Sequence, residues 1–113
     1  MFDTKIYLRD ILSAINKIEE YTKGLSFSDF EKKNIVIDAV VRNLMIIGEA
    51  VKSVPEDFRE ENKEIEWKRI AGFRDIAIHA YSNLDLKVVW EILKKGIPKL
   101  REQINSILNK EKK

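Results

Sequence analysis

The chain has 113 residues, of which 44% are hydrophobic and 35% charged, and it contains no Cys and a single His, His79. This composition predicts one domain over residues 1–113 and excludes disulfide scaffolds, cysteine-based zinc sites and a His-rich metal cluster within one chain. The net charge of +2 does not indicate nucleic-acid binding by itself, and the eight basic and three acidic groups of residues 87–113 fit a solvated helix face as well as an RNA-binding surface. No apolar run approaches the roughly 20 residues that cross a bilayer, and the first residues lack the pattern of a secretory signal. We therefore expect a cytoplasmic protein without a membrane span, a metal site or another cofactor.

The apolar residues recur at intervals of three and four along most of the chain, which is typical of amphipathic helices. Ile11, Ile15 and Ile18 carry this spacing in the first segment, and Gly24 stands where a C-terminal cap belongs. We expect the first helix near residues 3–23.

A second helix is indicated by Ser28 and Glu31, which have the spacing of a capping box, so we expect the helix to begin there. Pro55 ends it, because proline cannot continue a helix from within. The following residues 55–66 are too polar for a core helix and predict a connector with a short helix or turn. The apolar stripe of the second helix consists of Val36, Val40, Leu44, Ile47, Val51 and Val54.

A third helix is expected to begin near Trp67 and to end at Ser82 and Asn83. The residues expected to face the core from this helix are Ile70, Ala71, Ala77 and Ile78.

A fourth helix is predicted after Asp85, which can cap it, and Pro98 inside its apolar stripe predicts a kink. No segment alternates between polar and apolar residues with the period of a strand. The sequence thus predicts an all-α fold, an antiparallel bundle of four main helices with a short extra helix or turn in the connector. The stripe of the fourth helix consists of Leu86, Val89, Leu93, Ile97, Leu100, Ile104 and Ile107.

Residues 67–81 concentrate the side chains that could carry chemistry, namely Arg74, Asp75, His79 and Tyr81. On an ideal helix Asp75 and His79 share a face, whereas Arg74 and His79 diverge by about 140°. Arg74 and His79 can act at one point only if the helix unwinds near His79, or if two subunits related by a two-fold axis pool their copies. A purely structural role is the other interpretation, with Asp75 hydrogen-bonded to His79 and Tyr81 packed against the protein.

Three other positions need an interpretation. Gly48 lies inside a predicted helix and indicates that another helix approaches closely there. The neighbouring Glu49 can either pair with Arg74 or face solvent. Trp67 and Trp90 could stack on bases, but their helical spacing favours a place in the core.

The order of these motifs resembles the HepT-like family of the HEPN superfamily, the toxin-type partners of minimal nucleotidyltransferases. The resemblance covers nearly the whole chain. It is carried by residues 8–12, by residues 43–50, by Trp67 and by residues 74–81, which match Arg-x4-His-x-Tyr. The sequence departs from the family at Asp75, where the family often has Asn.

The resemblance implies a HEPN-like fold and the toxin of a type VII-like toxin–antitoxin system. The implied activity is metal-independent cleavage of RNA, with catalytic Arg74 and His79 supported by Asp75 and Glu49. Because each chain has one histidine, the mechanism implies a homodimer that supplies both a base and an acid. It also implies that a cognate nucleotidyltransferase antitoxin transfers AMP to Tyr81 and so blocks access of RNA. The alternative is a non-catalytic helical dimer that binds a nucleotidyltransferase, a nucleotide or RNA.

Overall fold

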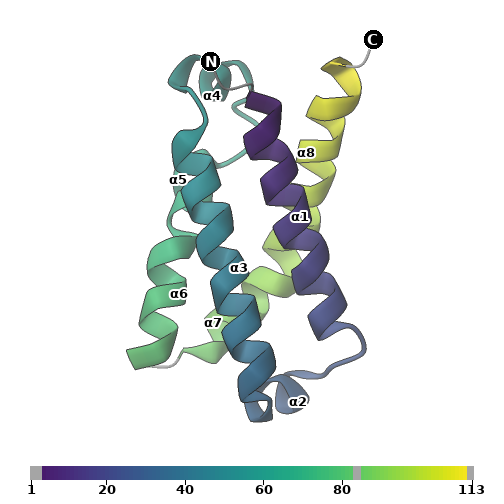
Figure 1. Ribbon diagram of the computed structural model, residues 1–113, viewed down its shortest axis with the longest axis vertical. Coiled ribbons are helices and arrows are strands. Elements are labelled where there is room, and N and C mark those ends of the chain that lie inside the picture. Colours follow the sequence, from purple (N-terminus) through teal and green to yellow (C-terminus); the bar gives the residue numbers. More distant parts are fainter. Residues whose placement is uncertain (1–3, 83–84, 112–113) are drawn as a thin grey trace.

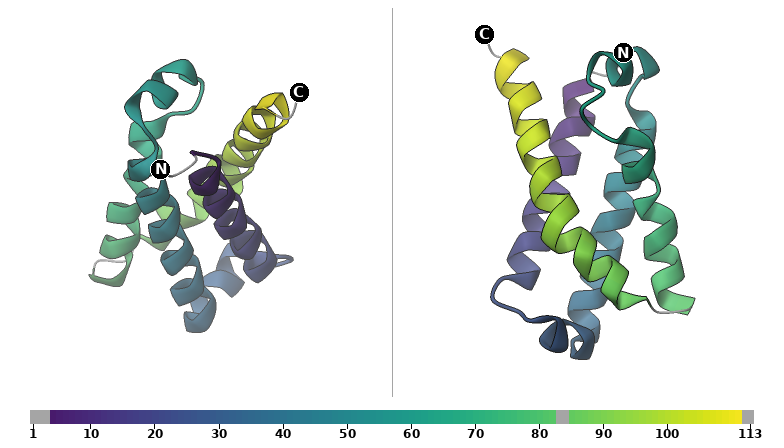
Figure 2. Two further views of the ribbon diagram at one scale, coloured as in Figure 1. Left: turned by 45° about the horizontal axis from the view of Figure 1, so that its top comes forward. Right: turned by 180° about the vertical axis from the view of Figure 1, so that it is seen from behind.

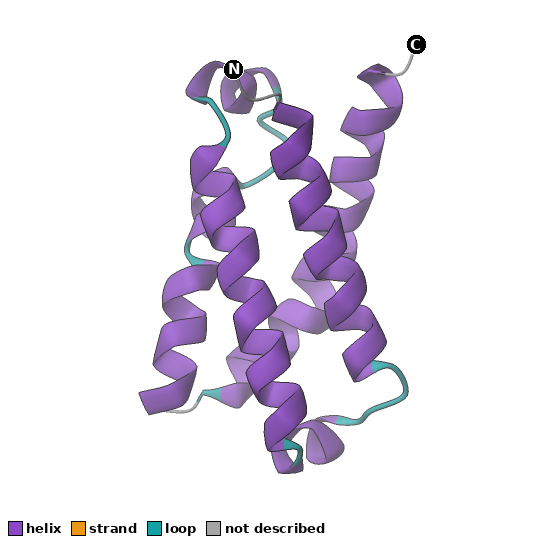
Figure 3. Ribbon diagram, in the orientation of Figure 1, coloured by secondary structure: helices purple, strands orange, loops and turns teal. Residues whose placement is uncertain are grey.

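The computed structural model describes residues 4–82 and 85–111, and within these ranges the regular elements are helices and no strand occurs (Figures 1 and 3). The predicted all-α class is therefore confirmed. Within the same ranges, no helix has the length and apolar character that a membrane span requires. The helices are α1 (Thr4–Thr22), α2 (Phe27–Lys32), α3 (Asn34–Ser53), α4 (Glu56–Glu61), α5 (Trp67–Ala71), α6 (Phe73–Ser82), α7 (Leu86–Glu91) and α8 (Ile97–Glu111), with a π-helical turn (Ile92–Gly96) between the last two.

The long helices are arranged so that α3 lies between α1 and α6 and contacts both (Figure 1). These neighbours run antiparallel, and α8 crosses the back of the layer diagonally, where it contacts α1 (Figure 2). The apolar stripes predicted from the sequence meet between the helices and exclude water, which is the main stabilising contribution of such a bundle. Fully buried side chains of this core include Leu8, Ile11, Ile15, Ile18, Leu44, Ile47, Ile97, Leu100 and Ile104.

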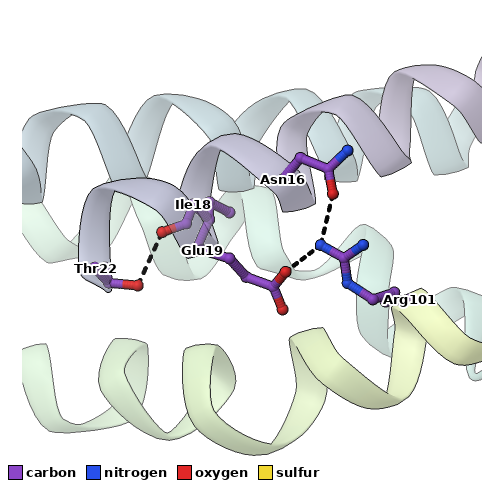
Figure 4. A network of polar contacts seen from close by, with 5 residues as sticks. All are labelled: Asn16, Ile18, Glu19, Thr22 and Arg101. Carbon is purple, nitrogen blue, oxygen red and sulfur yellow. Dashed lines mark hydrogen bonds and ion pairs between the residues drawn. The ribbon is translucent and has the colours of Figure 1, made fainter. Parts of the chain in front are cut away.

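A polar network joins α8 to α1 (Figure 4). Arg101 Nη2 donates a hydrogen bond of 2.6 Å to Asn16 Oδ1 and also pairs with Glu19. One turn further along α1, Thr22 Oγ1 donates to the carbonyl of Ile18 at 2.9 Å. The Arg101 contacts fix how α8 lies on α1, on the side of α1 away from α6.

The second predicted helix is two helices, and its predicted capping box is wrong by two residues. Ser26, not Ser28, is the N-cap of α2: its Oγ accepts from the Asp29 N–H, and Asp29 Oδ2 accepts from the Ser26 N–H, both at 3.1 Å. The reciprocal pair Ser26 and Asp29 has the same spacing as a Ser-x-x-Glu box, with an acid one methylene shorter. After α2, the chain turns at Lys33 and α3 begins.

This cap gives a testable pH dependence. The Ser26 backbone N–H and side chain lower the pKa of the Asp29 carboxyl below its ordinary value, because they stabilise the ionised form. A carboxyl whose pKa is lower in the folded than in the unfolded state stabilises the fold above its unfolded pKa, and this contribution disappears as the pH falls through the folded pKa. In an NMR titration of the carboxyl groups, we expect Ser26→Ala to move the Asp29 pKa up toward its ordinary value. Ser28→Ala is the matched control, and an Asp29 pKa that responds to Ser28→Ala but not to Ser26→Ala would contradict the Ser26 cap.

The third predicted helix is divided at Gly72 into α5 and α6. Ile70 and Ala77 are buried as expected, but Ile78 is 40% exposed, so its predicted inward orientation is wrong. The break changes the helical phase: α6 turns Phe73 and Ala77, four residues apart, toward the core. Ile78, which lies about 140° around the helix from Phe73, therefore faces outward.

The fourth predicted helix keeps its stripe but contains a π-helical turn directly before Pro98. In this turn the Ile97 N–H donates to the Ile92 carbonyl, five residues earlier. Because a proline ring clashes with the carbonyl four residues before it, a wider turn at this place accommodates Pro98 without ending the helix. The connector of residues 55–66 contains the expected short helix, α4.

Candidate functional site

Arg74 lies where the start of α6 packs closely against α3. A Cβ atom added at Gly48 of α3 would lie 3.0 Å from both Arg74 Cβ and Arg74 N, and 3.1 Å from the Ala71 carbonyl oxygen. Only a glycine leaves room for this approach, so the close helix contact predicted from Gly48 is confirmed. The backbone at the base of the Arg74 side chain is thereby packed directly on α3.

The guanidinium of Arg74 is held by Glu49, the residue that follows Gly48 on α3. Arg74 Nε lies 2.5 Å from Glu49 Oε1, and the two side chains are 38% and 59% exposed. Of the two interpretations left open for Glu49, pairing with Arg74 is therefore the one that the structure shows. A guanidinium carries five N–H donors, and pairing through Nε leaves those of the two Nη atoms for an anion. Such an arrangement suits a phosphate-binding arginine that is accessible and oriented.

Arg74 and His79 both lie on α6, but within one chain they do not share a face of this helix. Asp75 and His79 are exposed, and α6 continues as a helix to Ser82, so the helix does not unwind near His79. On a continuous helix Arg74 and His79 point about 140° apart. Tyr81 belongs to α6, but its side chain lies outside the described part of the structure. Of the two routes to a joint site considered above, a second subunit is the one that is compatible with this helix.

The two tryptophans have the structural roles predicted for them. Trp67 is buried, and its Nε1 donates to the Asn62 carbonyl at 3.0 Å. Trp90 is half-buried against Phe30, with ring centroids 5.1 Å apart, and Lys94 Nζ lies 4.6 Å from the Trp90 ring centroid. Neither ring projects as a free platform for a base.

Beside the Glu49–Arg74 pair the structure has a groove that the sequence analysis missed. It lies between α1 and α3 and has a volume of about 610 Å³. On α3 the side chains that line it recur at helical spacing, apolar ones beside exposed polar ones, which is the sequence signal that could have revealed it. Its lining residues are Tyr7, Asp10, Val41, Arg42, Met45, Ile46, Glu49, Ala50 and Ser53.

A site for a metal ion is not apparent in the described ranges, since residues 4–82 and 85–111 contain no group of three His, Cys, Asp or Glu side chains placed to hold one.

Comparison with known proteins places this chain in a family. The family model described as "Ribonuclease HepT-like" matches residues 11–107. A protein of Methanocaldococcus jannaschii named "Gamma-glutamylcyclotransferase and putative RNase" is 49% identical over 94% of this chain, and the chain spans 48% of the length of that relative.

Two further relatives match along nearly their full lengths. A Caldanaerobacter subterraneus protein named "Putative RNase" is 46% identical over 94% of this chain and 95% of its own length. A Thermococcus cleftensis protein named "Probable ribonuclease HepT" is 43% identical over 91% of this chain and 94% of its own length. A search of solved structures gave no match. The family match covers most of the chain, and the chain therefore belongs to the HepT-like ribonuclease family.

Proposed function

We propose that this protein is an endoribonuclease that cuts RNA through attack by a 2′-hydroxyl group, without a metal ion. The observation that carries the proposal is the Glu49–Arg74 contact of 2.5 Å, which holds a half-exposed guanidinium in one position. The membership of the chain in a ribonuclease family supports the same conclusion. Asp75 follows Arg74 on α6, is exposed, and is assigned a supporting role in this proposal.

In the proposed reaction, His79 removes the proton from a 2′-hydroxyl, and the resulting oxygen attacks the adjacent phosphorus. Negative charge develops on the non-bridging phosphate oxygens, where the Arg74 guanidinium stabilises it. The bond from phosphorus to the 5′-oxygen then breaks, and that oxygen receives a proton from an acid. The products are a 2′,3′-cyclic phosphate and a 5′-hydroxyl, so atoms and charge balance without a co-reactant.

A homodimer is part of the proposal because one chain supplies neither the geometry nor the second proton-transfer group. Arg74 and His79 diverge on α6, and the chain has a single His. Two copies related by a two-fold axis would bring two arginines and two histidines to one cleft. One histidine would then act as the base and the other as the acid.

The proposal is tested by incubating the purified protein, in excess chelator, with an RNA pool and with DNA of the same sequences. We expect cleavage of RNA only, with cyclic phosphate ends, because DNA lacks the attacking 2′-hydroxyl. An RNA with a single 2′-deoxy substitution at a mapped cleavage position is the matched substrate control and should resist cleavage there. Equal cleavage of RNA and DNA, or cleavage that the chelator abolishes, would contradict the mechanism.

We also propose that the protein is a toxin silenced by a nucleotidyltransferase antitoxin. In this proposal the Tyr81 hydroxyl attacks the α-phosphorus of ATP, pyrophosphate leaves, and the added AMP fills the phosphate-binding cleft with negative charge. With a nucleotidyltransferase partner and ATP, mass spectrometry should find one AMP on Tyr81 and none on Tyr81→Phe. Growth arrest on expression should disappear with His79→Ala. Partner binding without arrest by the wild type would instead indicate the non-catalytic dimer.

A further inference from the structure

The groove between α1 and α3 opens beside the proposed phosphate-binding arginine. Glu49 pairs with Arg74 and also lines the groove, so the groove and the guanidinium meet at this carboxylate. Along α3 the groove extends from Val41 to Ser53 and includes Glu49, and α1, which lies alongside α3 in Figure 1, forms its other wall. The cleavage chemistry proposed above uses none of the groove residues except Glu49.

The lining of the groove has the composition of a nucleotide-binding surface. Tyr7 on α1 contributes a half-buried aromatic ring, and exposed Asp10 and Arg42 stand at the rim. Single-stranded RNA is commonly bound by stacking of its bases on aromatic rings and by hydrogen bonds to base edges. The floor consists of apolar side chains that are buried or half-buried: Val41, Met45, Ile46 and Ala50.

We propose that this groove binds a nucleotide of single-stranded RNA adjacent to the phosphate that Arg74 holds. The inference rests on the proposed function, since it takes Arg74 as the ligand of the cleaved phosphate. The base lies on the apolar floor against Tyr7. Asp10 accepts hydrogen bonds from N–H groups on the base edge, and Arg42 binds the next phosphate along the strand.

The spacing of charges favours RNA over other occupants. Arg42 and Glu49 lie seven residues apart on one face of α3, which separates them by about 10.5 Å along the helix axis. The apolar side chains of Met45 and Ile46 lie between Arg42 and Glu49 along α3, and Glu49 carries the paired Arg74, so a base on these two side chains would have a cationic group on either side. The groove volume of 610 Å³ also lies within the range of about 300–1,000 Å³ that is typical of small-ligand sites. Glu49 pairs with Arg74 through Nε, so the Nη atoms of the same guanidinium remain as donors for a phosphate.

The test measures binding separately from cleavage. The probe is a short, fluorescein-labelled, single-stranded RNA with 2′-O-methyl groups, which lacks the attacking hydroxyl and cannot be cut. Fluorescence anisotropy gives the Kd for the full chain and for Tyr7→Leu and Arg42→Gln. Tyr21→Leu and Arg69→Gln are matched controls, because Tyr21 and Arg69 are exposed and lie outside the groove. Sedimentation of each variant reports its oligomeric state.

We expect Tyr7→Leu to weaken binding about tenfold, the scale of one lost base–aromatic stack, and Arg42→Gln to weaken it and reduce its salt dependence. The controls should bind like the wild type. Equal binding by all variants, or no binding by the wild type, would overturn the groove assignment. Dissociation of a dimer by the groove variants would show that a second copy occupies the groove, which also overturns it. If the groove variants bind the RNA as the wild type does and the wild type still cleaves RNA, the groove assignment fails and the ribonuclease proposal stands. If the groove variants lose RNA binding but the wild type does not cleave RNA, the ribonuclease proposal fails and the groove assignment stands.

Discussion

His79→Ala is expected to slow RNA cleavage by a factor of about 10² to 10⁴, the usual contribution of a positioned general acid or base. The effect is large because His79 is the single histidine of the chain, so no other imidazole can take the proton of the 2′-hydroxyl. His79 is exposed on α6, and its loss should leave the fold unchanged. Single-turnover cleavage rates in excess chelator, with circular dichroism spectra of each variant, measure the two effects.

Arg74→Ala is expected to slow single-turnover RNA cleavage by a factor of about 10² to 10³, because the charge developing on the phosphate loses its stabilising cation. Arg69→Ala is the matched control: Arg69 is an exposed arginine of α5 that pairs with Glu66. Equal cleavage by wild type, His79→Ala and Arg74→Ala would identify a contaminating nuclease and refute both assigned roles.

Mixing the two inactive variants tests whether the site is shared between subunits. If Arg74 of one copy acts with His79 of the other, a mixed dimer of Arg74→Ala and His79→Ala chains contains one intact Arg–His combination. We then expect a small recovery of cleavage after the two proteins are unfolded and refolded together, because this dimer keeps one histidine as the base but lacks the second histidine that acts as the acid. No recovery in a verified mixed dimer would contradict a site in which Arg74 of one copy acts with His79 of the other.

Gly48→Ala is expected to destabilise the fold by about 1–3 kcal/mol, the usual cost of inserting a methyl group into a packed interface. The new Cβ would meet the Arg74 backbone nitrogen at 3.0 Å and the Ala71 carbonyl oxygen at 3.1 Å, and backbone atoms cannot move aside alone. The α5–α6 segment must therefore shift away from α3 and carry Arg74 with it. We expect a lower midpoint in urea unfolding together with slower RNA cleavage.

Gly96→Ala is the control for this experiment, since its added Cβ would come no closer than 3.8 Å to Ile92 and Phe73. An alanine fits there at ordinary contact distance and restricts the unfolded chain, so the variant should be as stable as the wild type or more stable by up to about 1 kcal/mol. Wild-type stability and cleavage rate in Gly48→Ala would show that the contact between α3 and α6 is not needed to position Arg74.

The all-α class and most of the core followed from the sequence because burial of an apolar stripe depends on local periodicity. The stripe of the fourth predicted helix, for example, is buried from Val89 to Ile107 despite the π-helical turn within it. The capping box was misplaced because Ser26 and Ser28 both satisfy the spacing rule. The folded chain decides between them, because the Ser26 side chain accepts a hydrogen bond from the Asp29 N–H in the first turn of α2.

The sequence by itself determined the helical class, the motif residues and the need for a small residue at position 48, because each of these depends on chemistry or spacing within one helix. The tertiary structure decided that Glu49 pairs with Arg74, that α6 begins anew after Gly72 and turns Ile78 outward, and that a groove lies beside the pair. These features depend on how α1, α3 and α6 are placed against one another. The placement results from packing of many side chains at once, and no single segment of the sequence encodes it.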